Sequence, residues 1–259
     1  MKAAHGVERA GEAKPVSSLA PGVNGCPQTA PADLSVIIPV LDEADGIVQA
    51  LTALAPMRAR GVEIVVVDGG SRDQTIERAR PLADRVIVAP RGRGAQMNAG
   101  AAVAAGTVLL FLHADTRLPD DADRLIVEGL ARSGHAWGWF DVRIAGSHPL
   151  FPLIAAMMNL RSRLTGIATG DQAMFMNSEA FAAGFPDIPL MEDIAMSKRL
   201  KRLGRPLCIA TPVVTSGRRW KKHGVARTIL LMWRLRFAYL MGADPARLAR
   251  SYGYAPRQS

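Results

Sequence analysis

Three acidic residues lie where hydrophobic segments of the sequence end, and their types suit one shared site. Asp68 ends Glu-Ile-Val-Val-Val-Asp, Asp115 ends Val-Leu-Leu-Phe-Leu-His-Ala-Asp, and Asp193 lies in Pro-Leu-Met-Glu-Asp-Ile. Continuous Val, Ile and Leu bounded by Gly or Asp is typical of a strand buried on both faces of a parallel sheet. Ligands of such sheets bind outside the carboxyl ends of the strands. The arrangement suits a nucleotide diphosphate held through a metal ion, with one carboxylate left for proton transfer.

A basic, glycine-rich segment supplies a second set of candidate residues. The segment Arg91-Gly92-Arg93-Gly94 precedes an alanine-rich stretch that contains Asn98. Glycine lets a backbone approach a ligand closely, and the N-terminus of a helix attracts anions. We therefore predict that Arg93 and Asn98 contact the nucleotide. A flexible surface turn is the alternative that the sequence leaves open.

Strands and helices must alternate to bring these residues together. Strands are predicted at residues 34–40, 63–67, 85–89 and 108–112, and the helices between and after them at 46–57, from 74, from 94 to about 106, and from 120 or 121. This order predicts an α/β fold whose parallel sheet has right-handed crossovers. Beyond residue 130 we expect strands at 137–144, 173–176 and 206–210, helices at 149–164, 192–204 and 225–241, and loops at 170–172 and 216–223.

Length and composition indicate a globular protein with a sizeable core. The chain has 259 residues, 49% of them hydrophobic, which fits one large domain or two small ones. Its two cysteines, Cys26 and Cys208, form neither a disulfide framework nor a Cys-x-x-Cys metal motif, so a reducing cytoplasm is expected. We predict a disordered leader at residues 1–32, a catalytic domain at 33–223 and a basic amphipathic helical segment at 224–259.

Positive charge is concentrated toward the end of the chain. The net charge is +9, but residues 198–259 hold 15 Lys and Arg against one acid, whereas the preceding residues are net negative. This asymmetry predicts an anionic partner, either phosphates or an acidic membrane surface. No zinc-finger spacing or aromatic RNA-binding motif accompanies the charge, so no nucleic acid is expected.

Two apolar segments raise the question of a membrane. No uncharged apolar stretch reaches the roughly 18 residues that a membrane-spanning helix needs. Residues 225–241 nevertheless predict an amphipathic helix with interleaved arginines, and residues 149–158 supply a second apolar segment. One hypothesis is a peripheral protein on the inner face of the cell membrane. The alternative is a C-terminal helix that packs on the core.

Five segments, taken together and in this order, resemble glycosyltransferase family 2, the inverting enzymes with the glycosyltransferase-A fold. The chain also resembles a bacterial subfamily known as radical-SAM/selenodomain-associated transferases and its carotenoid-acid glycosyltransferase relatives. The resemblance covers residues 34–220 and implies a mostly parallel, Rossmann-like sheet flanked by helices, with a C-terminal helical extension. It rests on Val36-Ile37-Ile38-Pro39-Val40-Leu41-Asp42-Glu43, Val67-Asp68-Gly69-Gly70-Ser71-Arg72-Asp73, His113-Ala114-Asp115, Glu192-Asp193 and Arg218-Arg219-Trp220.

The resemblance implies roles for the residues that would hold the donor. Pro39 and Glu43 would line the nucleoside pocket, and Asp68 would accept a hydrogen bond from the base. Asp115 stands in the family's Asp-x-Asp metal motif and would bind Mg²⁺ or Mn²⁺, which prefer oxygen ligands. His113 replaces the usual first acid of that motif and is a poorer partner for Mg²⁺.

The resemblance also implies which residues face the acceptor and the leaving group. Asp193 would be the catalytic base, although acids in a first helical turn often only complement the helix dipole. The predicted reaction moves a sugar from a nucleotide-diphosphate sugar, UDP-linked, to an acceptor hydroxyl or carboxyl on a lipid-like or carotenoid molecule. The acceptor or diphosphate side is predicted to comprise Asp171, Gln172, Glu192, Arg218, Arg219 and Trp220.

Two other functions compete with this prediction. A sugar-phosphate nucleotidyltransferase shares a similar sheet but needs a glycine-rich loop with Arg and Lys after its first strand. The loop here, Asp42-Glu43-Ala44-Asp45, would repel phosphate. A non-catalytic peripheral membrane protein that only binds nucleotide sugars is the second alternative. The donor sugar, the acceptor and the oligomeric state stay open.

Overall fold

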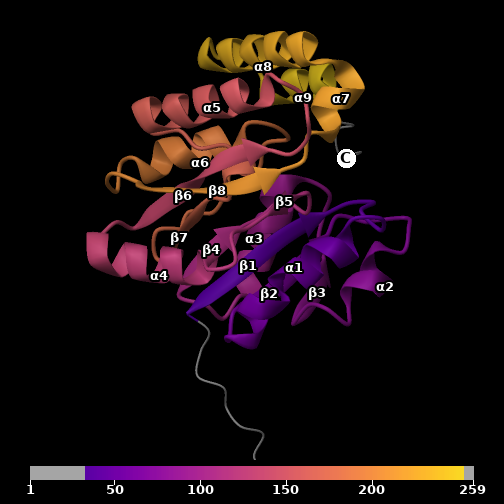
Figure 1. The fold of residues 1–259 in the computed structure, drawn as a ribbon, viewed down its shortest axis with the longest axis vertical. Helices are drawn as coiled ribbons and strands as arrows, with labels where there is room; N and C mark the ends of the chain where they lie inside the picture. Colours follow the sequence, from indigo (N-terminus) through magenta and orange to yellow (C-terminus); the bar gives the residue numbers. More distant parts are fainter. Residues whose placement is uncertain (1–32, 254–259) are drawn as a thin grey trace, which may run out of the picture. The chain divides into compact units, whose positions relative to one another are not determined.

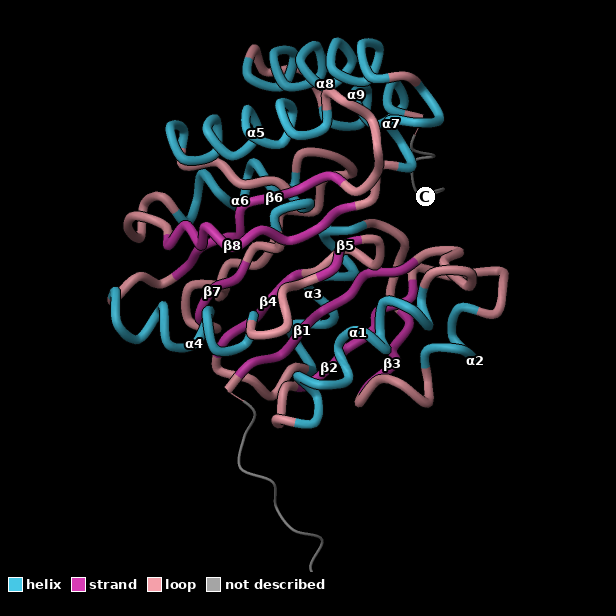
Figure 2. The backbone as a smooth tube through the Cα atoms, in the orientation of Figure 1, coloured by secondary structure: helices cyan, strands magenta, loops and turns pink. Residues whose placement is uncertain are grey.

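The structure, a computed structural model, describes residues 33–253, apart from the side chains of Arg219 and His223. The predicted leader at 1–32 lies outside the described residues. Within them, eight strands form one sheet in the order β3-β2-β1-β4-β7-β6-β8-β5 (Figures 1 and 2). This arrangement of a mixed sheet flanked by helices confirms the predicted α/β class.

Four parallel strands build one half of the sheet. β1 pairs with β2 and β4, and β2 pairs with β3, in each case in parallel. Such connections require crossovers, which the helices supply. The elements of this half are β1 (Leu34–Val40), α1 (Ile47–Ala59), β2 (Glu63–Asp68), α2 (Thr75–Ala79), β3 (Arg85–Val88), α3 (Arg93–Val103) and β4 (Val108–Phe111).

The direction of the strands changes in the other half. β7 runs antiparallel to both β4 and β6, and β8 pairs in parallel with β6. The two-residue β5 pairs antiparallel with the end of β8. The elements are β5 (Thr116–Arg117), α4 (Ala122–Ser133), β6 (Trp137–Ile144), α5 (Phe151–Thr165), the 3₁₀ turn η1 (Gly170–Gln172), β7 (Phe175–Asn177), α6 (Glu192–Leu200) and β8 (Leu207–Thr215).

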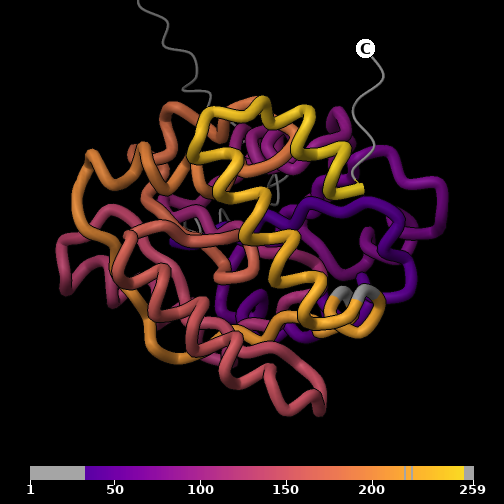
Figure 3. The backbone as a smooth tube through the Cα atoms, turned by 90° about the horizontal axis from the view of Figure 1, so that it is seen from above, coloured from indigo at the N-terminus to yellow at the C-terminus, as the bar shows by residue number. Residues whose placement is uncertain are grey.

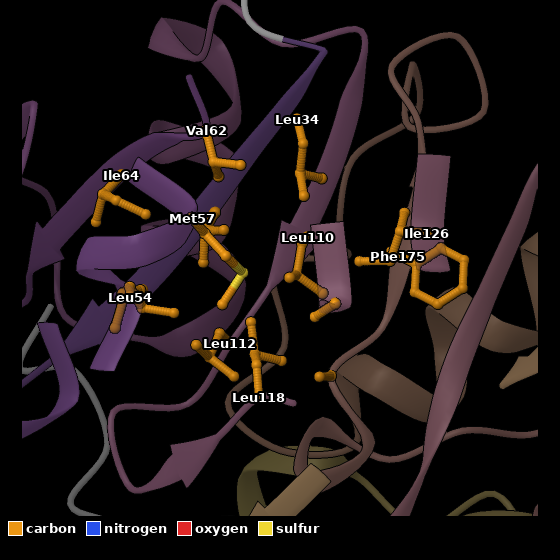
Figure 4. Packing of buried hydrophobic residues seen from close by; sticks show 14 of the residues in the cluster. Leu34, Leu54, Met57, Val62, Ile64, Leu110, Leu112, Leu118, Ile126 and Phe175 are labelled. Atoms are coloured by element: carbon orange, nitrogen blue, oxygen red, sulfur yellow. The ribbon is translucent and has the colours of Figure 1, made fainter. Parts of the chain in front are cut away.

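Alternate residues of the central strands enter two separate cores, as the period of two in a strand requires. In β1, Val36 and Ile38 belong to one cluster, and Ile37 belongs to the other. Helices α1 and α4 cover the first cluster, where Leu54, Met57 and Ile126 pack against the strands (Figure 4). Helices α3 and α6 cover the second. Because both faces are buried, the central strands are apolar throughout.

Three C-terminal helices and α5 lie beyond β6 and β8. They are α7 (Arg218–His223), α8 (Val225–Leu240) and α9 (Pro245–Tyr252). Figure 1 shows α5, α8 and α9 close together at the top of the view, beyond β6 and β8. Figure 3 shows the same region from above, with α5 and α8 in front of the sheet. No helix of the described residues is long and apolar enough to cross a bilayer.

Two segments differ most from the sequence prediction, while several other elements begin or end a few residues from their predicted bounds. Residues 216–223, predicted as a loop, contain α7, because Trp220 packs edge-on against Phe151 and anchors the turn. The strand predicted at 206–210 extends to Thr215. Pro212 would normally end it, but an irregularity opposite Phe140 and Asp141 shifts the register and accommodates the proline. The short elements β5 and α9 were not predicted.

Candidate functional site

A cavity of about 350 Å³ opens beyond the carboxyl ends of β1 and β4. This is where a doubly wound sheet is expected to bind its ligand. Six predicted site residues line it, and the lining includes residues of α7, α8 and α9. The polar and aromatic lining comprises Glu43, Arg91, Arg93, Gln96, His113, Asp115, Asp171, Thr215, Ser216, Trp220, Thr228 and Tyr252.

The loop after β1 presents Glu43 to this cavity. Asp42 adopts a left-handed conformation, with φ of 52°, and its Oδ1 accepts a hydrogen bond from Arg72 N at 2.8 Å. Glu43 N donates to Thr75 Oγ1 at 2.9 Å, so a neighbouring loop holds the backbone in place. Burial raises the pKa of Glu43, the charge of Asp115 adds to this, and Arg218 opposes it.

Arg218 contacts two of the three carboxylates that line the larger cavity. Its Nη2 lies 3.6 Å from Glu43 Oε2 and 3.8 Å from Asp115 Oδ2. Glu43 follows β1, Asp115 follows β4, and Arg218 begins α7, so three distant segments meet here. The three charges form a patch that can hold a polar ligand carrying both hydroxyl and phosphate groups.

Asp115, the expected metal ligand, lies in the larger cavity. The side chain of Asp115 lies in the turn between β4 and β5 and is about one-third exposed in the cavity. Within residues 33–253, no three His, Cys, Asp or Glu side chains gather into a ready-made metal cluster. Mg²⁺ and Mn²⁺ commonly bind through one or two carboxylates plus substrate phosphates and water, so the single carboxylate fits such an ion.

His113 contacts Asp171 and not Asp115. Its Nδ1 lies 3.5 Å from Asp171 Oδ1, and its ring packs where a Cβ on Gly170 would stand. Burial alone would raise the pKa of Asp171, but the hydrogen bond from His113 and the charges of Arg93 and Arg236 outweigh it, so the pKa is lowered. His113, which replaces the usual acid, therefore packs against Gly170 and Asp171 in the wall of the site.

A smaller cavity of about 100 Å³ adjoins the first and contains Asp193. Arg93, His113 and Asp171 line both cavities. Asp193 Oδ2 accepts from Gly170 N at 3.0 Å, and its Oδ1 accepts from Ile194 N at 2.7 Å. These bonds fix the carboxylate at the start of α6.

Glu192 is the buried neighbour of Asp193. Its Oε1 lies 3.9 Å from Arg93 Nη1, and its side chain is almost completely buried. Burial raises the pKa of Glu192 to about 6, and the charge of Asp193 adds to the effect, while Arg93 opposes it. Met191, directly before it, has a left-handed φ of 71°, a conformation that costs a non-glycine residue energy and often occurs at functional sites.

The raised pKa of Glu192 predicts a pH-dependent stability. Between the ordinary value of 4.5 and about 6, the folded state holds a proton that the unfolded state releases. Its stabilising contribution is therefore present below pH 4.5 and is lost as the pH rises through 6. Relative to Glu192→Gln, the wild-type free energy of unfolding should fall by about 2 kcal/mol across this window. Urea unfolding of both proteins at several pH values measures it, and parallel pH curves would contradict it.

Two half-buried arginines, Arg236 and Arg161, lie in or near the wall of the smaller cavity. Arg236 of α8 lines it, and burial lowers its pKa while Asp193 and Asp171 oppose the shift. Burial lowers the pKa of Arg161, in α5, to about 10, and the charge of Arg236 contributes. Arg161 Nη2 donates to Ser162 Oγ at 2.7 Å, whereas its buried Nε has no hydrogen-bond partner among the described residues. The cations offset the cluster of acids at Asp171, Glu192 and Asp193.

Besides Arg218, three predicted site residues with described side chains lie outside both cavity linings. Asp68 is buried, and its carboxylate accepts from Gly70 N, Ser71 N and Ser71 Oγ, so it holds a turn. The amide of Asn98 pairs with the backbone N and O of Phe185. Gln172 accepts from Ser162 Oγ inside the protein.

The other predictions fall within the cavities or outside the described side chains. Pro39, Glu43, Arg93, Asp115 and Trp220 line the larger cavity, and Glu192 and Asp193 line the smaller one, while Asp171 lines both. Arg218 reaches the larger cavity through its two carboxylate contacts. The side chain of Arg219 lies outside the described part.

Among the site residues that sequence reasoning missed, four have contacts or positions that bear on function. Gln96 Nε2 donates to the carbonyls of Val40 and Val67, which ties α3 to the ends of two strands. Met232 and Tyr252, from α8 and α9, line both cavities, and Arg236 lines the smaller one. Gln96 follows the basic glycine segment closely enough to have been considered. No sequence signal marks the other three, because they reach the site only through helix packing.

Comparison with protein families gives one match over most of the sheet. The model of the family described as glycosyl transferase family 2 matches residues 35–188, more than half of the chain. Among curated proteins, the PGL/p-HBAD biosynthesis glycosyltransferases of Mycobacterium tuberculosis and Mycobacterium bovis are 38% identical over 91 residues, which are 32% of this chain. The match spans only 36% of the length of these relatives.

Solved structures show the same fold at low sequence identity. S. aureus TarS, residues 1–349, has a TM-score of 0.58 and 19% identity, covering 71% of this chain and 60% of that one. A mannosyltransferase from Pyrobaculum calidifontis, in complex with GDP-Man and Mn²⁺, has a TM-score of 0.57 and 22% identity, covering 82% and 64%. Glucosyl-3-phosphoglycerate synthase from Mycobacterium tuberculosis, in complex with Mn²⁺ and UDP, has a TM-score of 0.54 and 21% identity, covering 70% of each chain.

Proposed function

The chain belongs to glycosyl transferase family 2, and from this we propose that it is an inverting enzyme that moves a sugar from a UDP-linked donor to an acceptor. The observation that carries the proposal is the pair of adjoining cavities. The larger contains Glu43 and Asp115, which follow β1 and β4 and contact Arg218, and the smaller contains Asp193. A donor and an acceptor can therefore meet at the shared wall formed by Arg93, His113 and Asp171.

The donor nucleotide would occupy the larger cavity. The carboxylate of Glu43 can accept hydrogen bonds from ribose hydroxyls, and the neighbouring Pro39 gives the nucleoside an apolar wall. Arg93 and Arg218 offer cationic groups to the diphosphate, for which the planar guanidinium is well suited. The solved complexes of similar fold contain UDP, UDP-GlcNAc and GDP-Man, which supports a nucleotide-diphosphate sugar as the donor class.

A divalent ion fits beside Asp115. The carboxylate supplies an oxygen ligand in the cavity, and the donor phosphates would supply others. A bound Mg²⁺ or Mn²⁺ stabilises the negative charge of a leaving diphosphate. Two solved structures of similar fold were determined with Mn²⁺, which supports this class of ion.

Asp193 would act as the base in a single displacement. The acceptor oxygen forms a bond to the anomeric carbon as the bond from that carbon to the diphosphate oxygen breaks. The electron pair of the broken bond leaves with the diphosphate, and the acceptor proton moves to Asp193. The hydrogen bonds from Gly170 N and Ile194 N orient the carboxylate for this transfer. Arg218 balances the charge that develops on the leaving group.

For the acceptor we propose a hydroxyl or carboxyl group on a lipid-like molecule. The smaller cavity combines its acids with an apolar wall of Leu190, Met191, Met232 and Leu235. A wall of this kind favours an acceptor whose reactive group is attached to apolar structure. The same proposal places the enzyme on the inner face of the membrane.

Donor binding gives the first test. A ligand at 100 times its dissociation constant stabilises the folded state by about 2.7 kcal/mol, which raises the melting temperature of a protein of this size by roughly 5–10 °C. We expect UDP-sugars to produce such a shift with Mn²⁺ and GDP- or dTDP-sugars to produce less. The release of free UDP, with and without lipid extract as the acceptor, then measures transfer. A protein that no nucleotide sugar stabilises would refute the proposal.

A further inference from the structure

Helices α5 and α8 each carry a stripe of large apolar side chains that face solvent. Ten of the thirteen large hydrophobic residues that are exposed within the described chain lie on these helices or their caps, and each is at least 44% exposed. Their spacing of three or four residues puts each set on one side of its helix. The stripes are Leu150, Leu153, Met157, Leu160 and Leu164 on α5, and Leu230, Trp233, Phe237, Leu240 and Met241 on α8.

The opposite sides of the same helices are already packed. Phe151 and Ile154 of α5 form one cluster with Val225 and Ile229 of α8, so the helices contact each other. Leu235 of α8 packs against Leu190 and Ile194 near the smaller cavity. Packing on the core therefore accounts for the inner sides, but no described part of the chain between residues 33 and 253 covers the two stripes. Monomeric proteins rarely expose an apolar patch of this extent without a partner.

The charges around the stripes are almost all positive. Residues 145–166 and 216–253, which contain α5, α7, α8 and α9, hold eleven Lys and Arg and one acid, Asp244. The exposed cations among them include Lys221, Lys222, Arg227, Arg234, Arg247 and Arg250. Arg163 is also exposed but pairs with Asp141 at 2.8 Å. Exposed apolar side chains surrounded by Lys and Arg match the interface of an anionic bilayer, where the apolar groups enter the acyl region and the cations meet the headgroups.

We propose that the α5/α8 face, defined by the ten residues of the two stripes, lies on an anionic membrane surface. Neither helix crosses the bilayer, since no described helix is long and apolar enough. Trp233 lies near the middle of the α8 stripe, and tryptophan is enriched at membrane interfaces. A second copy of the chain is the competing occupant. A two-fold contact would place one basic surface against another, which opposes association.

The position of α8 indicates which class of molecule is the acceptor. This inference rests on the proposed transfer activity. Trp233 and Phe237 are exposed on the outer side, while Met232, Leu235 and Arg236 line the smaller cavity beside Asp193. A helix with its side chains is only about 10 Å thick. The face that would touch lipid and the cavity that holds the base are therefore separated by one helix. This geometry assigns a membrane-resident amphiphile, whose polar end enters the smaller cavity, as the acceptor.

Vesicle binding tests the surface without any substrate. The full chain is centrifuged with vesicles of phosphatidylcholine alone, and with vesicles that contain phosphatidylglycerol, at low and high salt. We expect co-sedimentation with the anionic vesicles at low salt and a loss of binding at high salt or without the anionic lipid. The variants Leu153→Glu and Phe237→Glu should each lower the partition constant by about tenfold or more. Val88→Glu is the matched control, since Val88 is similarly exposed but lies on β3, at the far edge of the other half of the sheet.

The outcomes separate this proposal from the proposed function. Asp193→Asn should bind vesicles as the wild type does, and UDP-sugar stabilisation should survive in the stripe variants. Transfer to lipid extract held in vesicles should fall in the stripe variants, with the affinity for the UDP-sugar unchanged. Wild-type protein that stays in the supernatant with anionic vesicles at low salt would overturn the membrane face. So would stripe variants that bind as the control does, or a stable dimer that the stripe variants dissociate.

Discussion

Asp193→Asn is expected to lower the turnover number by about 10²–10⁴-fold, because asparagine keeps the shape of the side chain but cannot accept the acceptor's proton. Asp193 lines the smaller cavity and is absent from the lining of the larger one, so the affinity for the donor should be unchanged. Release of free UDP in the presence of lipid extract measures turnover, and calorimetry measures donor affinity. Turnover near the wild-type rate would exclude Asp193 as the base.

A structural effect of the same substitution can be separated from the chemical one. The two carboxylate oxygens accept from Gly170 N and Ile194 N, whereas asparagine offers only one acceptor oxygen. A lost bond of this kind costs about 1–3 kcal/mol of stability. The melting temperature of each variant is therefore measured together with its turnover rate. Asp187→Asn is the matched control, because Asp187 lies six residues before Asp193 in the sequence and lines neither cavity. If Asp193→Asn instead loses donor binding, Asp193 belongs to the nucleotide site.

Asp115→Ala is expected to abolish the increase in nucleotide affinity that Mn²⁺ produces. Asp115 is the exposed carboxylate of the larger cavity, and the ion would lose its protein oxygen ligand. We expect UDP to bind the variant with the same weak affinity with and without Mn²⁺. Titration calorimetry of UDP under the two conditions measures the difference.

The fold should survive this substitution. Asp115 is in a turn, and its contact with Arg218 is a 3.8 Å pair in which both side chains are substantially exposed, so its loss costs little stability. Asp120→Ala is the control, since it also removes one exposed carboxylate from the region after β4 but outside the cavity. If the UDP affinity of Asp115→Ala still rises with Mn²⁺, the ion binds through ligands other than Asp115.

Much of the sheet could be predicted from the sequence. The strands Leu34–Val40 and Trp137–Ile144 begin and end at the predicted residues. An apolar segment bounded by polar residues indicates a buried strand without any information from distant parts of the chain. Such segments place Glu43 and Asp115 at strand ends, and parallel strands bring their carboxyl ends to one edge. The direction of β7 was not predictable, because a short strand carries no signal of which neighbour it joins.

The roles of individual polar residues depended on their surroundings. Asn98 follows a basic glycine segment, as a ligand contact might be expected to do, yet its amide holds the backbone of Phe185, 87 residues away. His113 stands in a predicted metal motif, yet it contacts Asp171. Residue type specifies what a side chain can bind, but which partner it meets depends on a loop that arrives from elsewhere in the chain.

The sequence by itself determined most of the strands, the strand-end carboxylates and the basic character of residues 198–259, because each is a property of neighbouring residues. Tertiary structure alone decided that Arg218 lies between Glu43 and Asp115, and that Met232 and Tyr252 join both cavities. It also decided which side of α8 is buried. That helix is apolar on both sides, so its periodicity could not choose between them. The choice was made by packing against Leu190 and Ile194, which left Trp233 and Phe237 in solvent.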